Sequence, residues 1–208
     1  MSTPPAKPVP TLNIANVLTV VRILLVPFFV WFLLLDDSAP GGGNGLFRWL
    51  AVAVFAVAIY TDKLDGDLAR SRGLITDFGK IADPIADKLL IGSALILLSV
   101  LGELWWWVTI VILVRELGIT VLRFAVIRYG VMPASRGGKL KTVIQTFAIF
   151  LYLLPLAGVV GDWYTWLAIA VMLAAVAVTV ITGLDYIVQA VRLRRDSRAR
   201  GQSGSATS

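Results

Sequence analysis

The chain is dominated by long apolar segments separated by short polar ones. Of its 208 residues, 58% are hydrophobic and only 15% are charged. The mean hydropathy of +0.83 lies far above that of soluble globular domains. The first segment is long enough to cross a bilayer as a helix. We therefore predict an all-α integral membrane protein with six transmembrane helices, near residues 13–35, 46–60, 83–101, 105–128, 142–160 and 163–191.

The distribution of lysine and arginine predicts the topology. Basic residues are absent from the loops after the first, third and fifth segments. They are concentrated after the second, fourth and sixth, near residues 63–80, 128–141 and 192–200. Because basic loops stay on the cytoplasmic side of a membrane, both termini are expected in the cytoplasm. The same bias explains the formal charge of +6, so no nucleic-acid partner is predicted.

The polar ends of the chain flank a single predicted domain. Residues 1–12 hold four prolines and little to bury, which predicts a flexible N-terminal leader. Residues 13–195 form the six-helix membrane domain. The basic, low-complexity residues 196–208 are expected to be a disordered C-terminal tail.

Acidic residues concentrate between the second and third apolar segments. Asp62 and Asp65 are three residues apart, and Asp83 and Asp87 are four apart, so each pair shares one helix face. A solvated loop is the simpler interpretation, but this spacing favours two helical faces that form a socket of four carboxylates. On the predicted topology, this polar cavity faces the cytoplasm.

The composition restricts the chemistry of such a socket. The chain has no cysteine and no histidine, which excludes thiol and histidine-base catalysis and Cys/His zinc sites. A metal must be bound by oxygen, which favours magnesium, manganese or calcium. Two divalent ions among four carboxylates could bind the oxygens of a diphosphate and stabilise an in-line displacement at phosphorus.

Three features have more than one interpretation. Arg22 is close enough to the polar end of its segment to snorkel, or it binds an anionic group. Arg115 and Glu116, inside apolar sequence, form either a structural ion pair or part of an anion site. Asp83 followed by Pro84 resembles a helix N-cap with proline at the first helical position, which is compatible with a role in metal binding.

The spacing of the acidic region also matches a known signature, D-x2-D-G-x2-A-R-x8-G-x3-D-x3-D. The matching positions are Asp62, Asp65, Gly66, Ala69, Arg70, Gly79, Asp83 and Asp87. The chain therefore resembles the CDP-alcohol phosphotransferase family, which places this signature between the second and third of six helices. The stretches NIANVLTVVR (13–22), VRELGITVLR (114–123) and ASRGGKLKT (134–142) are most similar to the family's phosphatidylglycerophosphate synthases of the actinobacterial type.

The resemblance implies a metal-dependent transferase of phospholipid biosynthesis, in the EC 2.7.8 class, at a bacterial inner membrane. It would transfer the phosphatidyl group of CDP-diacylglycerol to glycerol 3-phosphate and release CMP. Two divalent cations, Mg2+ or alternatively Mn2+, and a homodimer are implied as well. The implied metal ligands are Asp62, Asp65, Asp83 and Asp87, and Asp87 is also the implied general base. The implied CDP-binding residues are Asn16, Thr19, Asp62, Asp65, Gly66, Ala69, Arg70 and Gly79.

The acceptor's phosphate dianion needs cationic partners. Arg115 and Arg123, inside a helix, and Lys139 and Lys141, in the basic loop, are the candidates. For the loop residues, ordinary positive-inside bias is the simpler explanation. Positive-inside bias does not explain Arg115 and Arg123, because topology alone does not require a charge inside a membrane span.

Other functions remain open. A member of the same family with inositol phosphate or phosphatidylglycerol as acceptor would keep the metal and CDP residues and differ in the basic pocket. A cation transporter would also carry intramembrane carboxylates, but spread over several helices and depths rather than on two neighbouring segments. A non-catalytic scaffold gives no reason for the fixed spacing.

Overall fold

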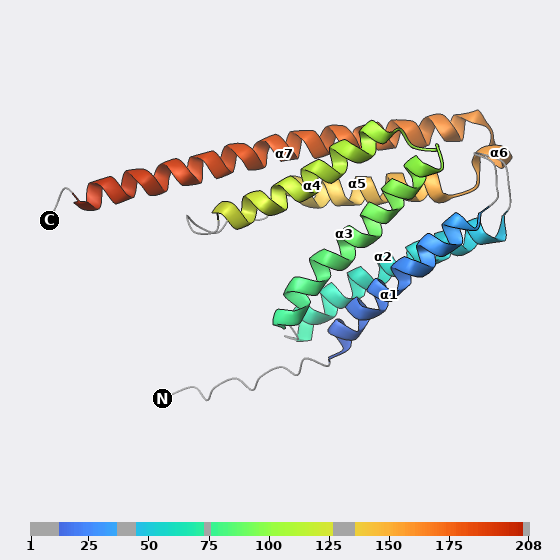
Figure 1. The fold of residues 1–208 in the computed structure, drawn as a ribbon, viewed down its shortest axis with the longest axis horizontal. Helices are drawn as coiled ribbons and strands as arrows, with labels where there is room; N and C mark the ends of the chain where they lie inside the picture. The colour runs from blue at the N-terminus through green and yellow to red at the C-terminus, as the bar shows by residue number, and fades with distance from the viewer. Residues whose placement is uncertain (1–12, 37–44, 73–75, 127–135, 206–208) are drawn as a thin grey trace. The chain divides into compact units, whose positions relative to one another are not determined.

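The computed structural model describes residues 13–36, 45–72, 76–126 and 136–205, apart from some side chains within them. All regular secondary structure in these residues is helical, which confirms the all-α prediction (Figure 1). The helices are α1 (Ile14–Leu34), α2 (Leu46–Arg72), α3 (Asp77–Val100), α4 (Trp106–Val126), α5 (Arg136–Leu153), the short α6 (Ala157–Val160) and α7 (Asp162–Ser205).

The chain divides into two compact units. The first comprises Met1–Leu101 and Leu153–Val160, and in it α1 packs against both α2 and α3. The second comprises Gly102–Tyr152 and Gly161–Ser208, and in it α4 packs against α7. The assignment of residues 13–195 to one domain stays a prediction.

One buried stripe runs along α1 and changes character along the helix. Its buried positions recur every three or four residues, as expected for a helix packed along one side: Ala15, Asn16, Thr19, Arg22, Val26, Phe29 and Leu33. The polar half lies near Asn13, whose side chain caps the helix by accepting a hydrogen bond from the Asn16 N–H at 3.0 Å. The apolar half packs on α2, where the Phe29 and Phe55 rings lie 5.6 Å apart.

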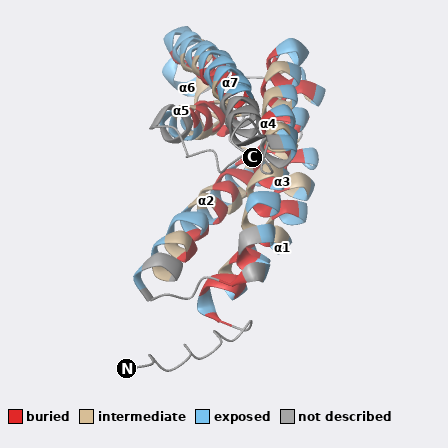
Figure 2. Ribbon diagram, turned by 90° about the vertical axis from the view of Figure 1, so that its left-hand side faces the viewer, coloured by how far each residue is buried: buried red, intermediate tan, exposed pale blue. Residues whose placement is uncertain are grey.

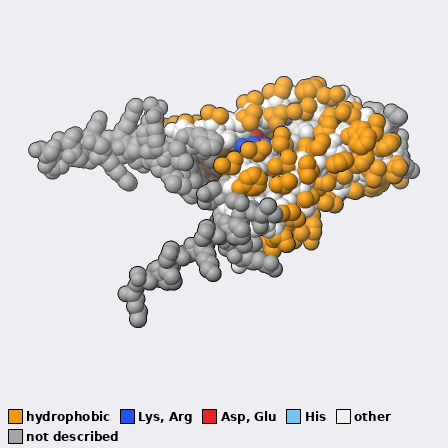
Figure 3. Space-filling view, turned by 60° about the horizontal axis from the view of Figure 1, so that its bottom comes forward, with side chains coloured by type: hydrophobic (Ala, Val, Ile, Leu, Met, Phe, Trp, Pro, Cys, Tyr) orange, Lys and Arg blue, Asp and Glu red, His pale blue; other side chains and the backbone are white. Residues whose placement is uncertain are grey.

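Large apolar side chains cover the outside of the helices. On α1 alone, Val20, Leu24, Phe28 and Trp31 are each at least 41% exposed. Buried and exposed residues alternate along the helices in Figure 2. In Figure 3 most of the described surface on the face shown is hydrophobic. A chain that buries an arginine and exposes leucine and tryptophan suits apolar surroundings better than water.

Two of the described helices are long and apolar enough to cross a membrane by length and composition. These are α1 and the part of α7 from Asp162 to Leu193. A shorter apolar helix, Leu140–Leu153, lies in α5. The six predicted segments correspond to the six long helices. The criterion of length and apolar composition supports two of these helices, α1 and α7, as membrane spans.

The helices that carry the carboxylates are longer than predicted. α2 continues to Arg72, so its acidic residues follow its apolar part without a break. α3 begins at Asp77, because the Thr76 hydroxyl oxygen caps it by accepting a hydrogen bond from the Gly79 N–H at 3.1 Å. The prediction that Asp83 and Pro84 begin the third helix is therefore wrong, and Pro84 lies inside α3.

The last two predicted segments also end at different places. α5 stops at Leu153 rather than near residue 160, because Pro155 lacks an N–H and disfavours helical backbone at the residue before it. Gly161, with φ of 105°, then turns the chain into α7. α7 extends to Ser205, so residues 196–205, which were expected in a disordered tail, belong to this helix. The predicted leader, 1–12, lies outside the described residues.

A second buried arginine lies near the start of α2. Arg48 is 5% exposed, and its Nη1 lies 3.5 Å from Asp36 Oδ2. Its Nε donates a hydrogen bond to the Leu153 carbonyl oxygen at 2.9 Å. These contacts tie the segment that follows α1 and the last residue of α5 to α2, and sequence analysis did not single out Arg48 for such a role.

Replacing Phe29 with Ala is expected to lower the free energy of unfolding by about 3 kcal/mol, because it opens a cavity beside Phe55 that the helices can fill only in part. Phe28→Ala is the matched control, since Phe28 is 49% exposed and points away from the packed side. Thermal unfolding in detergent, followed by circular dichroism, measures both. Equal losses of stability would contradict this packing of α1 on α2.

Candidate active site

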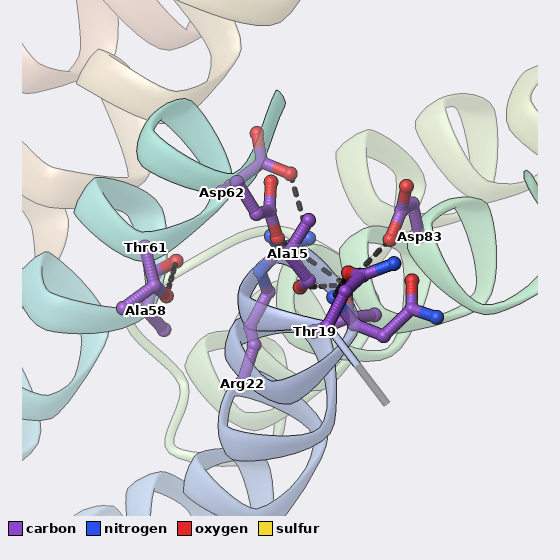
Figure 4. Close-up of polar contacts among 10 residues, drawn as sticks. Ala15, Thr19, Arg22, Ala58, Thr61, Asp62 and Asp83 are labelled. Carbon is purple, nitrogen blue, oxygen red and sulfur yellow. Dashed lines mark hydrogen bonds and ion pairs between the residues drawn. The ribbon is translucent and has the colours of Figure 1, made fainter. Parts of the chain in front are cut away.

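Two carboxylates of the signature meet one buried guanidinium. Asp62 and Asp65 lie one turn apart on α2, and Arg22 reaches them from α1. Arg22 Nη1 lies 2.6 Å from Asp62 Oδ1 (Figure 4). Its Nη2 pairs with Asp65 Oδ2. The Arg22 side chain is fully buried and that of Asp65 nearly so, whereas that of Asp62 is 48% exposed. Because a snorkelling arginine would expose its charge, the structure favours the interpretation in which Arg22 binds anionic groups, here those of its own chain.

Thr19 joins the carboxylates of α2 to α3. It precedes Arg22 by one turn on the same face of α1. Its hydroxyl oxygen lies 2.6 Å from Asp83 Oδ1 and 3.3 Å from Asp65 Oδ2, and the Ala15 carbonyl is a third acceptor at 3.1 Å (Figure 4). A hydroxyl donates one proton, and the shortest distance identifies Asp83 as its main acceptor. One face of α1 thus holds acidic residues from two other helices.

The position of Asn16 is fixed by the cap of α3. The Gly79 N–H donates to the Thr76 hydroxyl at 3.1 Å, and that hydroxyl donates to Asn16 Oδ1 at 2.9 Å. A Cβ on Gly79 would lie only 3.0 Å from Asn16 Oδ1 and 3.7 Å from Asp83 Oδ2. A larger residue at this position would force the Asn16 amide to shift. Asn16, Gly79 and Thr19 of the predicted CDP site therefore lie around Asp83.

Burial and charge act in opposite directions on Asp65, which lies beyond the apolar part of α2. Removal from water is the largest effect and raises the pKa of its carboxyl, whereas the nearby Arg22 guanidinium lowers it and repulsion from Asp62 and Asp83 raises it. Together these effects raise the pKa of Asp65 to about 6. One guanidinium faces three carboxylates, and this excess of negative charge favours a further cation.

The donor atoms suit a hard divalent cation, although their arrangement does not form a complete metal site. Asp62, Asp65 and Asp83 offer carboxylate oxygens, the ligands that Mg2+ and Mn2+ prefer. Among the described residues, no three acidic side chains are grouped so that they could hold one ion. Asp87 lies one turn after Asp83 on α3 and is half-buried.

The other predicted site residues are only partly placed. Gly66 follows Asp65 on α2 and is half-buried. Four side chains from the predicted sites lie outside the described set, namely those of Ala69, Arg70, Arg123 and Lys139.

Sequence analysis missed two roles. Thr76 was not considered, although a threonine directly before an acidic residue, here Asp77, is typical of a helix N-terminus. Arg22 was not connected to the carboxylates. The interval of three residues between Asn16, Thr19 and Arg22 marks a polar stripe on one helix face, and this signal could have identified Arg22 as part of a packed polar face, although not its partner.

A second polar cluster lies within the other unit. Arg115 Nη1 donates to Glu116 Oε1 at 3.0 Å, and Lys141 Nζ donates to the same oxygen. Arg115 Nη2 also donates to the Thr182 hydroxyl at 2.9 Å, and the guanidinium lies 5.8 Å from the centre of the Tyr186 ring. The expected ion pair between Arg115 and Glu116 is formed, and it joins two of the predicted acceptor-binding residues at one carboxylate.

The class of the protein follows from a family comparison. Residues 12–184 match the family model described as CDP-alcohol phosphatidyltransferase. The match covers most of the chain and the whole carboxylate site, and the chain belongs to the CDP-alcohol phosphatidyltransferase family. These are membrane-associated transferases that generally use divalent cations.

Individual relatives are more specific. The chain is 55% identical over 180 residues to the "Probable phosphatidylglycerophosphate synthase" of Mycobacterium tuberculosis, which covers 86% of this chain and 82% of that protein. It is 35% identical over 183 residues to the "CDP-diacylglycerol--glycerol-3-phosphate 3-phosphatidyltransferase" of Rickettsia typhi, covering 84% and 94%. The protein of that name from Bacillus subtilis is 36% identical over 191 residues, covering 84% and 93%. The resemblance inferred from the sequence is confirmed.

Gly79→Ala is expected to be less stable than the matched variant Gly118→Ala by about 1–2 kcal/mol. The added methyl group at Gly79 must displace the Asn16 amide and weaken its bond to Thr76. At Gly118, on α4, a Cβ meets no atom within 4 Å, so only the gain in helix propensity remains. Thermal unfolding of both variants measures the difference, and an equal gain in stability would contradict the close approach of α3 to Asn16.

Proposed function

We propose that this protein transfers the phosphatidyl group of CDP-diacylglycerol to glycerol 3-phosphate, giving phosphatidylglycerophosphate and CMP. The observation that carries this proposal is the convergence of Asp62, Asp65 and Asp83 on one face of α1, in a chain of this family. The names of the mycobacterial, rickettsial and Bacillus relatives support glycerol 3-phosphate as the acceptor.

The donor substrate is assigned to the first unit. Asp62, Asp65, Asp83 and Asp87 would hold the divalent cations, which we propose are two Mg2+ ions, with Mn2+ as an alternative. When bound, these ions would neutralise the diphosphate and stabilise charge that develops in the transition state. Asn16, Thr19, Gly66 and Gly79, with Ala69 and Arg70, would shape the CDP site, and the small residues among them allow the nucleotide to approach the backbone.

The reaction itself is a displacement at phosphorus. Asp87 accepts the proton of the acceptor hydroxyl, whose oxygen then forms a bond to the phosphorus that carries the diacylglycerol. The bond from that phosphorus to the bridging oxygen breaks, and CMP leaves with the electron pair. Asp87 is suited to act as general base because it is half-buried and lies one turn from Asp83.

The acceptor phosphate is assigned to cations of the second unit. Arg115 and Lys141 are proposed to bind it, together with Arg123 and Lys139. The shared contact of Arg115 and Lys141 with Glu116 supports the assignment, because it holds two cations within reach of one anionic oxygen. A phosphate dianion has more charge and more acceptor oxygens than one carboxylate, so it can compete with Glu116 for them.

We also propose that all six long helices span a bacterial inner membrane, with both termini and the polar cavity on the cytoplasmic side. We propose further that the helices form one domain and that the protein works as a homodimer. The exposed apolar side chains of the helices and the distribution of basic residues support the membrane placement.

The proposed reaction is tested by CMP release from CDP-diacylglycerol by the purified protein in detergent with Mg2+. Release with glycerol 3-phosphate, and not with inositol phosphate, phosphatidylglycerol or no acceptor, is the expected result. Release with another acceptor would contradict the acceptor assignment and leave the family chemistry intact. The absence of release under every condition would contradict the proposed function and favour a transporter.

In the same assay, Asp87→Asn is expected to lower kcat by about a hundredfold or more, because it removes the base and keeps the shape of the side chain. Binding of CDP-diacylglycerol should change little. Asp67→Asn is the matched control, since Asp67 is exposed and is not a signature position, and it should keep normal turnover. Normal turnover of Asp87→Asn would refute its role as base.

Lys141→Ala is expected to raise the KM for glycerol 3-phosphate about tenfold with a smaller effect on kcat, because it removes a charge that binds substrate and transition state alike. Lys141→Arg keeps the charge and should restore most of the affinity. The KM for CDP-diacylglycerol should stay the same in both variants. Lower thermal stability with an unchanged KM would instead limit Lys141 to a structural ion pair with Glu116.

A further inference from the structure

Arg22 occupies the space between two of the proposed metal ligands. Its Nη1 faces Asp62 and its Nη2 faces Asp65, so the guanidinium bridges carboxylates one turn apart on α2. The arginine is 0% exposed, although it lies on a helix that is apolar enough to span a membrane. The positive-inside rule does not explain a fully buried arginine on such a helix, so we look for a specific anionic partner.

The guanidinium holds the two carboxylates in different ways. Nη2 of Arg22 donates a hydrogen bond to Asp65 Oδ2, whereas Nη1 lies 2.6 Å from Asp62 Oδ1 as an ion pair only, and Nε has no hydrogen-bond partner among the described residues. A well-fitted structural arginine would use its planar set of donors in paired hydrogen bonds. Arg22 therefore supplies charge to Asp62 and Asp65 while part of its hydrogen-bonding capacity stays unused. Such an interaction can be exchanged for another cation more readily than a fully bonded pair.

From these observations we propose that Arg22 is an internal counter-ion that competes with the divalent cation for Asp62 and Asp65, and so sets the affinity of the site for metal. This inference rests on the proposed role of those aspartates as metal ligands. In the protein without metal, Arg22 keeps the two carboxylates together and neutralises part of their charge. When a cation binds, it takes over carboxylate oxygens that Arg22 contacts, so part of the binding free energy is used to displace the guanidinium.

The inference predicts that removing the guanidinium strengthens metal binding. We expect Arg22→Gln to bind Mn2+ at least tenfold more tightly than the unmodified protein, as measured by electron paramagnetic resonance in detergent without substrate. Its melting temperature in EDTA should be lower, because Asp65 is then buried without its partner. Its gain in melting temperature on adding Mn2+ should be larger. Arg22→Lys, which keeps a charge but loses the planar fork, should be intermediate, and it provides a second folded variant.

The matched control is Arg48→Gln. Arg48 is the other buried arginine described in this unit, is also paired with an aspartate, and is not part of the signature. It should lower the melting temperature and leave the Mn2+ affinity unchanged. A gain in affinity for Arg48→Gln as large as that for Arg22→Gln would mean that general loosening or net charge is responsible, and would overturn the inference.

Two further outcomes separate this inference from the proposed function. Unchanged or weaker Mn2+ binding by Arg22→Gln and Arg22→Lys, in a protein that still releases CMP, would overturn the competition and leave the reaction intact. Failure of every variant to bind Mn2+, together with no CMP release, would overturn both. Asp65→Asn in the Arg22→Gln background should abolish the gained affinity. Retention of the gain would place the ion elsewhere and also refute the inference.

Discussion

The first unit depends on how a buried carboxylate is paired in an apolar chain. An unpaired ionised group in such an interior costs several kcal/mol, so Asp65 can be buried because α1 brings the Arg22 guanidinium to it. The same stripe of α1 reaches Asp83, so it determines how α2 and α3 are placed around the first helix. Packing of the apolar half of that stripe, through Phe29, then keeps the polar half in register with the carboxylates.

The two units use the same principle with opposite charges. In the first, one guanidinium lies among carboxylates. In the second, the Glu116 carboxylate lies between Arg115 and Lys141. In each unit, one side chain of opposite charge allows like-charged side chains to lie close together among apolar helices before any ion or substrate binds. Each also leaves an excess of one sign, negative around Arg22 and positive around Glu116, which is suited to a cation and to a phosphate respectively.

The sequence predicted the helical class and the two carboxylate pairs because both depend on local patterns. Apolar length marks helices of this kind, and spacings of three and four residues place aspartates on one face whatever the tertiary structure. The start of α3 was predicted wrongly, since the strong Asp83-Pro84 pattern competes with the correct cap at Thr76. The partner of Arg22 was not predictable from its own segment, because the contact joins residues 43 positions apart and depends on how α1 packs against α2. The side chains of Arg70 and Lys139, which lie outside the described residues, stay predictions.

The buried pair of Arg48 and Asp36 has a consequence for the electrical work of membrane insertion. On the proposed topology, these residues lie at the outer end of the first two helices. Moving one elementary charge through a potential of about 100 mV involves about 2.3 kcal/mol. An arginine and an aspartate carried across as a pair have no net charge, so the membrane potential does little net work on this end of the unit. The protein can thus use an arginine to fasten Leu153 to α2 at an end where an uncompensated positive charge would oppose insertion.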